Sequence, residues 1–251
     1  MKIYRQTPII KIVNTVKTTS QDLVVTEIPL KIKINRKKLL TLICLPSDLE
    51  DLIYGFLFSN GIIQKDEDIK KLNINTNNSS INVTLTKPIK IKKTDKTYAS
   101  SGSKEFDQIA KNKRITAVFK ISASYIIKLT RDFLNKSDIY SKTGGVHSAA
   151  LTDGKKIMIF KDDIGRHNAI DKIIGEMLRK NISSDNKALL TSGRVSSEII
   201  AKIHRAGVPV IISKSAPTDR AIDLAKKGGV TLIKAAKSSV NVYCNEGRVS
   251  E

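Results

Sequence analysis

Two short turns in the second half of the sequence place an arginine directly after a glycine. They are Gly165-Arg166 and Gly193-Arg194, and each follows an apolar run and precedes a helical pattern. Glycine lets a ligand approach the backbone closely, and a guanidinium matches the geometry of a phosphate or a guanine edge. Free N–H groups at a helix start also attract anions. The turns indicate a phosphate-rich ligand, although ordinary helix starts can look the same.

Two histidines stand in loops that contain glycine. His147 follows Gly144-Gly145-Val146, and His167 belongs to the turn that begins at Gly165. An imidazole in such a loop can bind phosphate or transfer a proton. Metal binding is the weaker interpretation, because no second His, Cys or carboxylate stands at ligand spacing from either histidine. His204 lies within a helical pattern, which favours a structural role.

Three carboxylates and both cysteines have simple structural interpretations. Asp162, Asp163 and Asp171 stand near an expected helix start, where negative side chains favour the positive end of the helix dipole. Cys44 and Cys244 are too few for a disulfide framework or a four-thiolate zinc site. Free cysteines mostly behave as small buried hydrophobes. We therefore expect no metal site, and a protein of a reducing compartment.

Strands and helices alternate through the second half of the chain. Apolar runs predict strands over 157–160, 188–191, 210–213, 230–233 and 240–243. Helical patterns follow the first three of these runs. Apolar strands joined by helices require a sheet covered on both faces, which is an α/β fold of the three-layer α/β/α sandwich type. Ligands in such folds bind beyond the carboxyl ends of the strands, which is where the glycine turns stand.

The first half predicts a smaller α+β domain. Residues 30–34 and 81–85 alternate apolar and polar side chains, as half-buried strands do. A helix is expected between them, with Ser47 as its N-cap and Glu50 completing a capping box. Gly61 is expected to end this helix.

Residues 87–113 separate the two halves. They contain eight lysines against three acidic residues and few large apolar side chains. This composition predicts an exposed, mobile basic connector, with residues 95–108 as its loop. We therefore expect domains over residues 1–113 and 114–251.

The charge of the chain has two explanations. The 251 residues include 44 Lys and Arg against 24 Asp and Glu, a formal net charge of +20. The lysines are spread evenly, so compositional bias explains the charge as well as attraction to an anionic ligand does. A basic nucleic-acid-binding protein is thus the alternative hypothesis, although aromatic residues are only 5% and tryptophan is absent. No membrane-length apolar segment or signal peptide is evident, so a cytoplasmic protein is expected.

Several blocks together resemble the formate dehydrogenase accessory sulfurtransferase family, FdhD. The resemblance covers roughly residues 20–245 and is most specific in the Gly-Arg-His-Asn-Ala block. The blocks occur in the family's order at 48–50, 55–57, 61–63, 144–149, 163–172, 192–196 and 215–218.

The resemblance implies a fold, a cargo and partners. The larger domain is expected to be similar to the cytidine deaminase fold and to bind the bis(molybdopterin guanine dinucleotide) molybdenum cofactor, with GDP as a mimic. A zinc deaminase activity is excluded, because the His-x-Glu and Pro-Cys-x-x-Cys signatures are absent. The expected cofactor-binding residues are Gly144, Gly145, His147, Gly165, Arg166, His167, Asn168, Ser192, Gly193, Arg194, Ser215, Thr218, Ala235, Ala236, Lys237, Ser238, Ser239 and Val240.

The same resemblance implies a homodimer and a series of sulfur-transfer steps. In the family, a loop Cys-x-x-Cys accepts persulfide sulfur from a cysteine desulfurase. The sulfur then passes to the molybdenum before the cofactor enters formate dehydrogenase or a related molybdenum or tungsten enzyme. No membrane and no specific nucleic acid is expected among the partners.

This sequence departs from the family at two places. Ser101 and Lys104 stand at the two loop cysteine positions, and neither a hydroxyl nor an ammonium can hold a persulfide. Near the C-terminus, the stretch from Lys234 to Lys237 replaces a Gly-Phe-x-Arg motif, so the aromatic ring is lost and the charge is kept. Cofactor binding is therefore expected to survive better than sulfur transfer.

Overall fold

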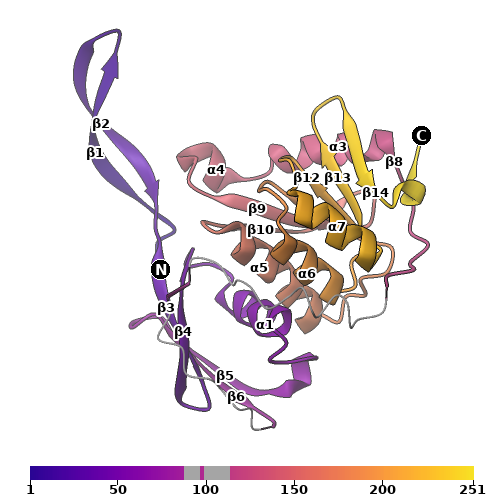
Figure 1. Ribbon diagram of the computed structural model, residues 1–251. Helices are drawn as coiled ribbons and strands as arrows, with labels where there is room; N and C mark the ends of the chain where they lie inside the picture. The colour runs from indigo at the N-terminus through magenta and orange to yellow at the C-terminus, as the bar shows by residue number, and fades with distance from the viewer. Residues whose placement is uncertain (88–96, 99–113) are drawn as a thin grey trace.

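The computed structural model describes residues 1–87, 97–98 and 114–251, and its main body is built on two large sheets (Figure 1). The larger sheet has six strands in the order β10-β9-β11-β12-β13-β14. These strands are β9 (His147–Thr152), β10 (Ile157–Asp163), β11 (Ala188–Thr191), β12 (Val210–Ser213), β13 (Thr231–Ala235) and β14 (Val240–Cys244). All five strands predicted in the second half are therefore confirmed, and β9 was missed.

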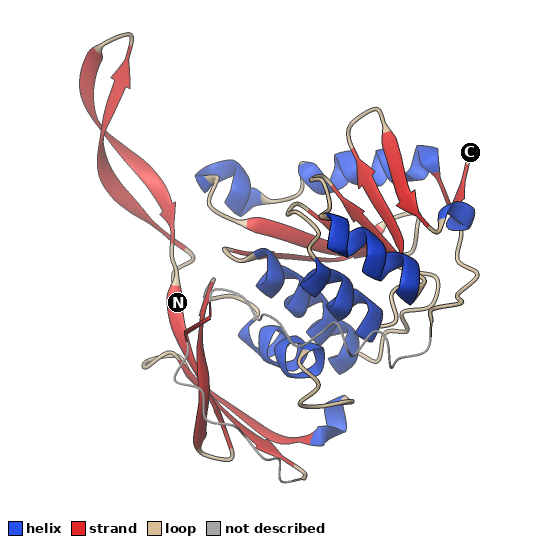
Figure 2. Cartoon of the chain, viewed as in Figure 1, coloured by secondary structure: helices blue, strands red, loops and turns tan. Residues whose placement is uncertain are grey.

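Helices cover both faces of the larger sheet (Figure 2). Helices α5 (Arg166–Arg179), α6 (Ser197–Arg205) and α7 (Asp219–Gly228) share one core with alternate residues of the strands. The opposite face packs against α3 (Ala123–Leu134) and the preceding short strand β8 (Ile121–Ser122), which pairs with β15 (Val249–Ser250). The α/β/α sandwich is thus confirmed, whereas the likeness to the cytidine deaminase fold stays a prediction.

The smaller sheet has five strands in the order β5-β6-β3-β4-β7. Its strands are β3 (Ile28–Ile34), β4 (Lys37–Cys44), β5 (Ile69–Asn75), β6 (Ser80–Leu85) and β7 (Thr97–Tyr98). The isoleucines and leucine of β3 are buried and its proline and two lysines are exposed, so the alternation read from the sequence is confirmed. Helix α1 (Leu49–Ser59) closes the core of this sheet.

Helix α1 begins differently from the expected capping box. Asp48, in the left-handed region at φ 49°, is the N-cap, and no side chain caps the helix. The Glu50 carboxylate instead pairs with Arg179 of α5 at 2.7 Å, and the Ser47 hydroxyl accepts a hydrogen bond from Lys172. The capping-box prediction is therefore wrong, because contacts to the other half of the chain take both side chains. Gly61, at φ 70°, does follow the helix end as expected.

The described N-terminus forms a separate hairpin that the sequence patterns did not predict. Strands β1 (Tyr4–Val13) and β2 (Val16–Val25) pair only with each other. In Figure 1 this hairpin, which we call the arm, projects away from both sheets. Only its base contacts the body, where Lys142 of the short helix α4 (Asp138–Thr143) lies over the Tyr4 ring at 5.7 Å.

A dense set of charges joins the two sheets. Lys161 of β10 contacts Asp48 at 2.6 Å, Asp51 at 2.8 Å and Glu176 at 2.7 Å. Arg179 also reaches the Asp51 carboxylate. Because these pairs link α1 to α5 and β10, the two halves pack closely. The division into domains 1–113 and 114–251 stays a prediction, and the expected connector lies mostly outside the described residues.

Two fully buried lysines neutralise two of the carboxylates near the expected helix start. Lys172 contacts Asp163 at 2.8 Å, and Lys202 contacts Asp171 at 2.6 Å, with every side chain 0% exposed. Asp162 and Asp163 end strand β10, and Asp171 lies inside α5. Asp163 does lie at the start of α5, where its carboxylate accepts a hydrogen bond from the Gly165 backbone N–H at 3.0 Å, so the helix-dipole interpretation stays a prediction beside these ion pairs.

Candidate functional site

A pocket of about 740 Å³ opens at the edge of the larger sheet where β11, β12 and β13 end. We call it the edge pocket. Its walls come from the end of α3, from α4 and its following turn, from the ends of β11 and β13, and from Lys214 after β12. Its described lining consists of Phe133, Leu134, Asn135, Ser137, Tyr140, Gly144, Gly145, Val146, His147, Ser148, Ile164, Ser192, Lys214, Ala235, Ala236 and Lys237.

The edge pocket brings together part of the set predicted from sequence. The shared feature of these residues is that they lie in turns or at strand ends, at the same edge of the sheet. They are Gly144, Gly145, His147, Ser192, Ala235, Ala236 and Lys237. Ala236 and Lys237 stand in the β13–β14 connection, which also contains Ser238 and Ser239 and leads into β14 at Val240.

Ser192 links several of these turns. Its hydroxyl accepts a hydrogen bond from the Ser148 backbone N–H at 2.9 Å and lies 3.3 Å from Nδ1 of His147. The Ser215 hydroxyl donates to the Ser192 carbonyl at 3.0 Å. Thr218 accepts from the Ala221 backbone as the N-cap of α7. The turns after β11 and β12 are thus fixed by their own polar groups.

His147 enters the pocket as a neutral hydrogen-bonding group. Burial lowers the pKa of His147, and the positive charge of Arg166 lowers it further. An imidazole with a lowered pKa is uncharged at neutral pH, so it offers a donor or an acceptor rather than a charge. His147 can therefore orient a ligand, while positive charge must come from other residues.

The sequence patterns missed two polar residues of this region. Asp162 accepts hydrogen bonds from Ser148 at 2.6 Å and from Ser137 at 2.7 Å, and burial raises the pKa of this carboxyl. Because Ser137 is the N-cap of α4, Asp162 attaches one wall of the pocket to the sheet. Lys214 is the other missed residue. The signal for it was its place directly after an apolar strand, since that position reaches the ligand-binding edge.

The two glycine–arginine turns lie side by side. A Cβ atom at Gly193 would stand 2.8 Å from the Cβ of Arg166, so only glycine allows this approach. Gly165 is the N-cap of α5, and Arg194 is exposed beside α6. The Nε atom of Arg166 is buried and has no hydrogen-bond partner among the described residues. This arrangement leaves Arg166 a donor that a ligand or water could satisfy.

Two residues predicted to bind the cofactor lie inside the protein instead of on the pocket wall. His167 and Asn168 are each 2% exposed. The Asn168 amide donates to the Ile43 carbonyl and to Asp163, both at 2.9 Å. Burial, followed by the charges of Lys202 and Arg166, lowers the pKa of His167 to about 3. Their ligand contacts stay a prediction, and their described contacts position the start of α5.

The cysteines offer little nucleophilic chemistry. Both are buried, and burial, together with the nearby Asp163 charge, raises the pKa of Cys44 to about 12. Burial also raises the pKa of Cys244. Neutral thiols are poor nucleophiles. Ser101 and Lys104, the expected counterparts of the loop cysteines, lie outside the described residues.

Over residues 1–87, 97–98 and 114–251, no group of three or more His, Cys, Asp or Glu side chains is arranged to hold a metal ion. None of the helices in these same ranges is both long and apolar enough to cross a membrane.

Comparisons with known proteins agree with the resemblance read from the sequence. Sulfur carrier protein FdhD of Bacillus subtilis is 37% identical over 240 residues, which cover 92% of each chain. The protein of the same name from Staphylococcus haemolyticus is 39% identical over 239 residues, or 91% of this chain and 90% of its own. Among solved structures, a protein from Desulfotalea psychrophila described as a formate dehydrogenase accessory protein is similar, with a TM-score of 0.84 and 26% identity over 99% of this chain and all of its own. The model of the FdhD/NarQ family matches residues 25–250. The chain therefore belongs to the FdhD/NarQ family.

Proposed function

We propose that this chain is an accessory protein for the maturation of formate dehydrogenase or a related molybdenum or tungsten enzyme. It holds the guanine dinucleotide form of the molybdenum cofactor as cargo, with a guanine nucleotide end in the edge pocket. The names of its relatives support the maturation role. The single observation that carries the assignment is the edge pocket, where Lys214, Lys237 and Ser192 lie together at the carboxyl ends of the strands.

The chemistry of the pocket fits a nucleotide diphosphate. Lys214 and Lys237 supply positive charge for the phosphates, and Ser192 and the glycines of the α4–β9 turn allow close backbone approach. Phe133 and Val146 give an apolar wall for a base or a pterin ring. A volume of about 740 Å³ lies within the usual range of small-molecule sites.

The proposed role excludes a persulfide on this chain's own thiols. Its only cysteines are Cys44 and Cys244, and both are buried with raised pKa values. A sulfane sulfur needs a thiolate that can attack and hold it. We therefore infer that the chain carries and protects the cofactor, and that it accepts no sulfur from a cysteine desulfurase at Ser101 or Lys104. Family membership also supports a homodimer that acts in the cytoplasm.

Titration with GDP tests the pocket. Each pocket lysine is exposed, so solvent screening limits its contribution to the free energy of GDP binding to roughly 0.5–1 kcal/mol. The double variant Lys214→Ala/Lys237→Ala is therefore expected to weaken GDP binding about tenfold. Lys227→Ala is the matched control, since this lysine is exposed on α7 and does not line the pocket. Equal GDP affinity in the wild type and the double variant, or no binding by the wild type, would refute the assignment.

A further inference from the structure

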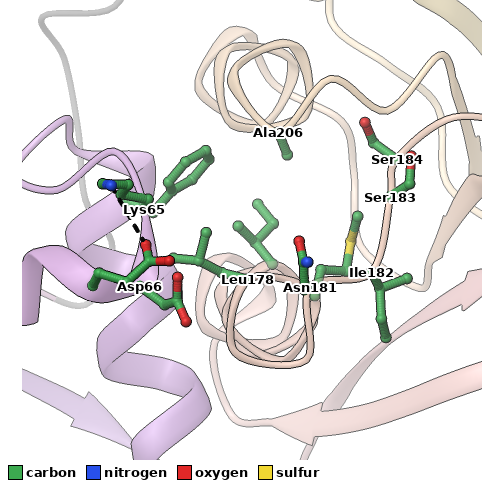
Figure 3. A pocket seen from close by; sticks show the side chains of 12 residues that line it. Lys65, Asp66, Leu178, Asn181, Ile182, Ser183, Ser184 and Ala206 are labelled. Atoms are coloured by element: carbon green, nitrogen blue, oxygen red, sulfur yellow. Dashed lines mark ion pairs between the residues drawn. The ribbon is translucent and has the colours of Figure 1, made fainter.

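A second pocket, of about 490 Å³, lies at the end of α5 that is remote from the edge pocket. We call it the α1–α5 pocket, since it opens between the end of α1 and the end of α5 (Figure 3). Ile164, which lines the edge pocket, precedes α5, whereas Leu178 stands in the last turn of this helix. Because α5 has 14 residues, the two pockets lie roughly 20 Å apart. The α1–α5 pocket is therefore separate from the proposed cofactor site.

The floor of the α1–α5 pocket is apolar. Its apolar lining residues are Phe58, Ile174, Met177, Leu178, Ile182 and Ala206. Ile174 and Met177 are 2% and 5% exposed and belong to the core between α5 and the larger sheet, so packing fixes this floor. In Figure 3 the Ala206 side chain points into the cavity from the end of α6, across from Leu178. A cavity of this volume with apolar walls is suited to a small molecule with an apolar body.

The rim of the pocket is acidic. Asp66 and Glu67 line it, and they begin a run of three carboxylates in the short 3₁₀ helix η1 (Asp66–Asp68). Lys65 pairs with Glu67 at 3.9 Å, but these side chains are 67% and 68% exposed, so solvent weakens the pair. Within residues 1–87, 97–98 and 114–251, Asp66 has no ion-pair partner. Asp66 therefore presents an uncompensated carboxylate to the pocket.

Three helices end beside the same cavity. Phe58 is the last residue but one of α1, Leu178 is the last but one of α5, and Ala206 directly follows α6. The carboxyl end of a helix carries partial negative charge, which favours a cation beside its last turn. The helix ends and the carboxylates of η1 thus act in the same direction.

The nearby arginines do not cancel this negative charge inside the cavity. Arg179 is held by the carboxylates of Glu50 and Asp51, and Arg205 lies over the Phe58 ring at 5.4 Å. Neither guanidinium is part of the described lining. In a chain of formal net charge +20, an acidic rim of this kind is an exception, so it favours cations over anions of equal apolar area.

We propose that the α1–α5 pocket binds a small organic cation with an apolar body, such as an alkyl or aryl amine. The apolar body occupies the floor, and the ammonium group donates hydrogen bonds to the Asp66 carboxylate at the rim. Because α1, η1 and α5 all line the pocket, a bound amine links the smaller unit to the sandwich and stabilises the folded protein by mass action. This site does not depend on cofactor binding in the edge pocket.

Three probes with the same hexyl chain separate the apolar contribution from the ionic one. Hexylammonium, 1-hexanol and hexanoate are each titrated into the full chain, and the methyl NMR signals of Ile174, Met177 and Ile182 are followed. Hexylammonium is expected to shift these signals at low millimolar concentration and to bind about fivefold more tightly than 1-hexanol, with hexanoate the weakest. No shift with hexylammonium, or equal affinity for hexylammonium and hexanoate, would overturn the proposal.

Two variants assign the contacts. Asp66→Asn is expected to remove the preference for hexylammonium over 1-hexanol and to leave the affinity for 1-hexanol unchanged. Ala206→Leu fills part of the cavity and is expected to weaken both probes about tenfold. Asp223→Asn is the matched control, since Asp223 is exposed on α7 and does not line the pocket. An unchanged preference in Asp66→Asn, or unchanged affinities in Ala206→Leu, would contradict this site.

A short peptide with leucines beside a lysine is the probe for another occupant, the basic segment of a partner protein. If this peptide shifts the same methyl signals at lower concentration than hexylammonium, the assignment to a small amine is wrong. GDP titration of Asp66→Asn and Ala206→Leu is expected to match the wild type. Failure of this proposal is therefore distinguishable from failure of the proposed function.

Discussion

Gly55 of α1 and Gly175 of α5 face each other where the two helices cross. A Cβ atom at Gly55 would stand 2.9 Å from the Gly175 nitrogen and would overlap the Asp171 carbonyl. A Cβ atom at Gly175 would likewise stand 2.8 Å from the Gly55 nitrogen and would overlap the Asp51 carbonyl. The two helices therefore touch backbone to backbone. This contact, together with the Lys161 and Arg179 ion pairs, holds the smaller sheet against the sandwich.

Replacing Gly175 with alanine is expected to destabilise the protein. Alanine normally stabilises a helix interior relative to glycine by about 0.5–1 kcal/mol. Here the added methyl meets backbone atoms that cannot rotate away, so Gly175→Ala is expected to lower the free energy of unfolding by roughly 1–3 kcal/mol. Denaturant unfolding measures the change. Gly247→Ala is the control, because nothing lies within 4 Å of a Cβ there. A stabilised Gly175→Ala variant would contradict the close crossing.

The buried Lys202–Asp171 pair gives a second stability prediction. Lys202→Met leaves the Asp171 carboxylate without its counter-ion in a fully buried site, which is expected to lower the free energy of unfolding by about 3–5 kcal/mol. The double variant Lys202→Met/Asp171→Leu removes both charges and should regain most of that loss. Denaturant curves of the single and double variants test the pair. A double variant as unstable as the single one would show that packing, and not the unpaired charge, controls this site.

His167 predicts a loss of stability in mild acid. Its folded pKa of about 3 lies below the ordinary value near 6.5, so the unfolded chain binds a proton that the folded chain does not. The stability that the uncharged His167 contributes is complete above about pH 6.5. It is lost as the pH falls, at up to about 1.4 kcal/mol of unfolding free energy per pH unit. Denaturant unfolding gives the free energy of unfolding at pH 7.5 and at pH 5.5. The difference between these two free energies is expected to be smaller for His167→Gln than for the wild type. The same pH difference in both proteins would contradict the buried neutral imidazole.

Sequence patterns predicted the sandwich because most of its strands are apolar runs between polar turns, although β9 was missed. The strands over 157–160 and 188–191 were recognised this way, and so was the edge where ligands bind. The arm was missed, because strands β1 and β2 carry no buried face and therefore no alternation that marks a core. Long-range partners explain the error at the start of α1 and the unforeseen ion pair in α5. No local spacing shows that Glu50 reaches Arg179, or that Asp171 reaches Lys202.

The site was predicted unevenly for the same reason. Gly144, Gly145 and Ser192 lie in turns, and strand ends bring turns to one edge whatever the packing elsewhere. His167 and Asn168 belong to the same motif, yet the helix turn rotates them into the protein, where Asn168 bonds Ile43. Lys214 was missed because its residue type carries no signal in a sequence rich in lysine, and only its place after an apolar strand marks it.

The thiols give a prediction about sulfur chemistry. Incubation with a cysteine desulfurase and cysteine is expected to leave no persulfide at Ser101 or Lys104, and only trace labelling of Cys44 and Cys244, because burial keeps those thiols neutral. Mass spectrometry of the intact and digested protein detects the added sulfur. Unfolding in guanidinium before alkylation is the control, since both cysteines should then react fully. Stoichiometric persulfide on Cys44, lost in Cys44→Ser together with activation of formate dehydrogenase, would show that this chain carries sulfur itself.

The most direct test of the central claim is whether the protein carries the cofactor when it is purified from a host that makes the guanine dinucleotide form. Oxidation of the purified protein releases any bound pterin as a fluorescent product, and its amount is compared with that of molybdenum or tungsten and of guanine nucleotide. The wild type and Lys227→Ala are expected to retain pterin, guanine nucleotide and metal together, and Lys214→Ala/Lys237→Ala to retain much less. A wild-type protein that carries neither pterin nor guanine nucleotide would contradict the role as a carrier of the cofactor.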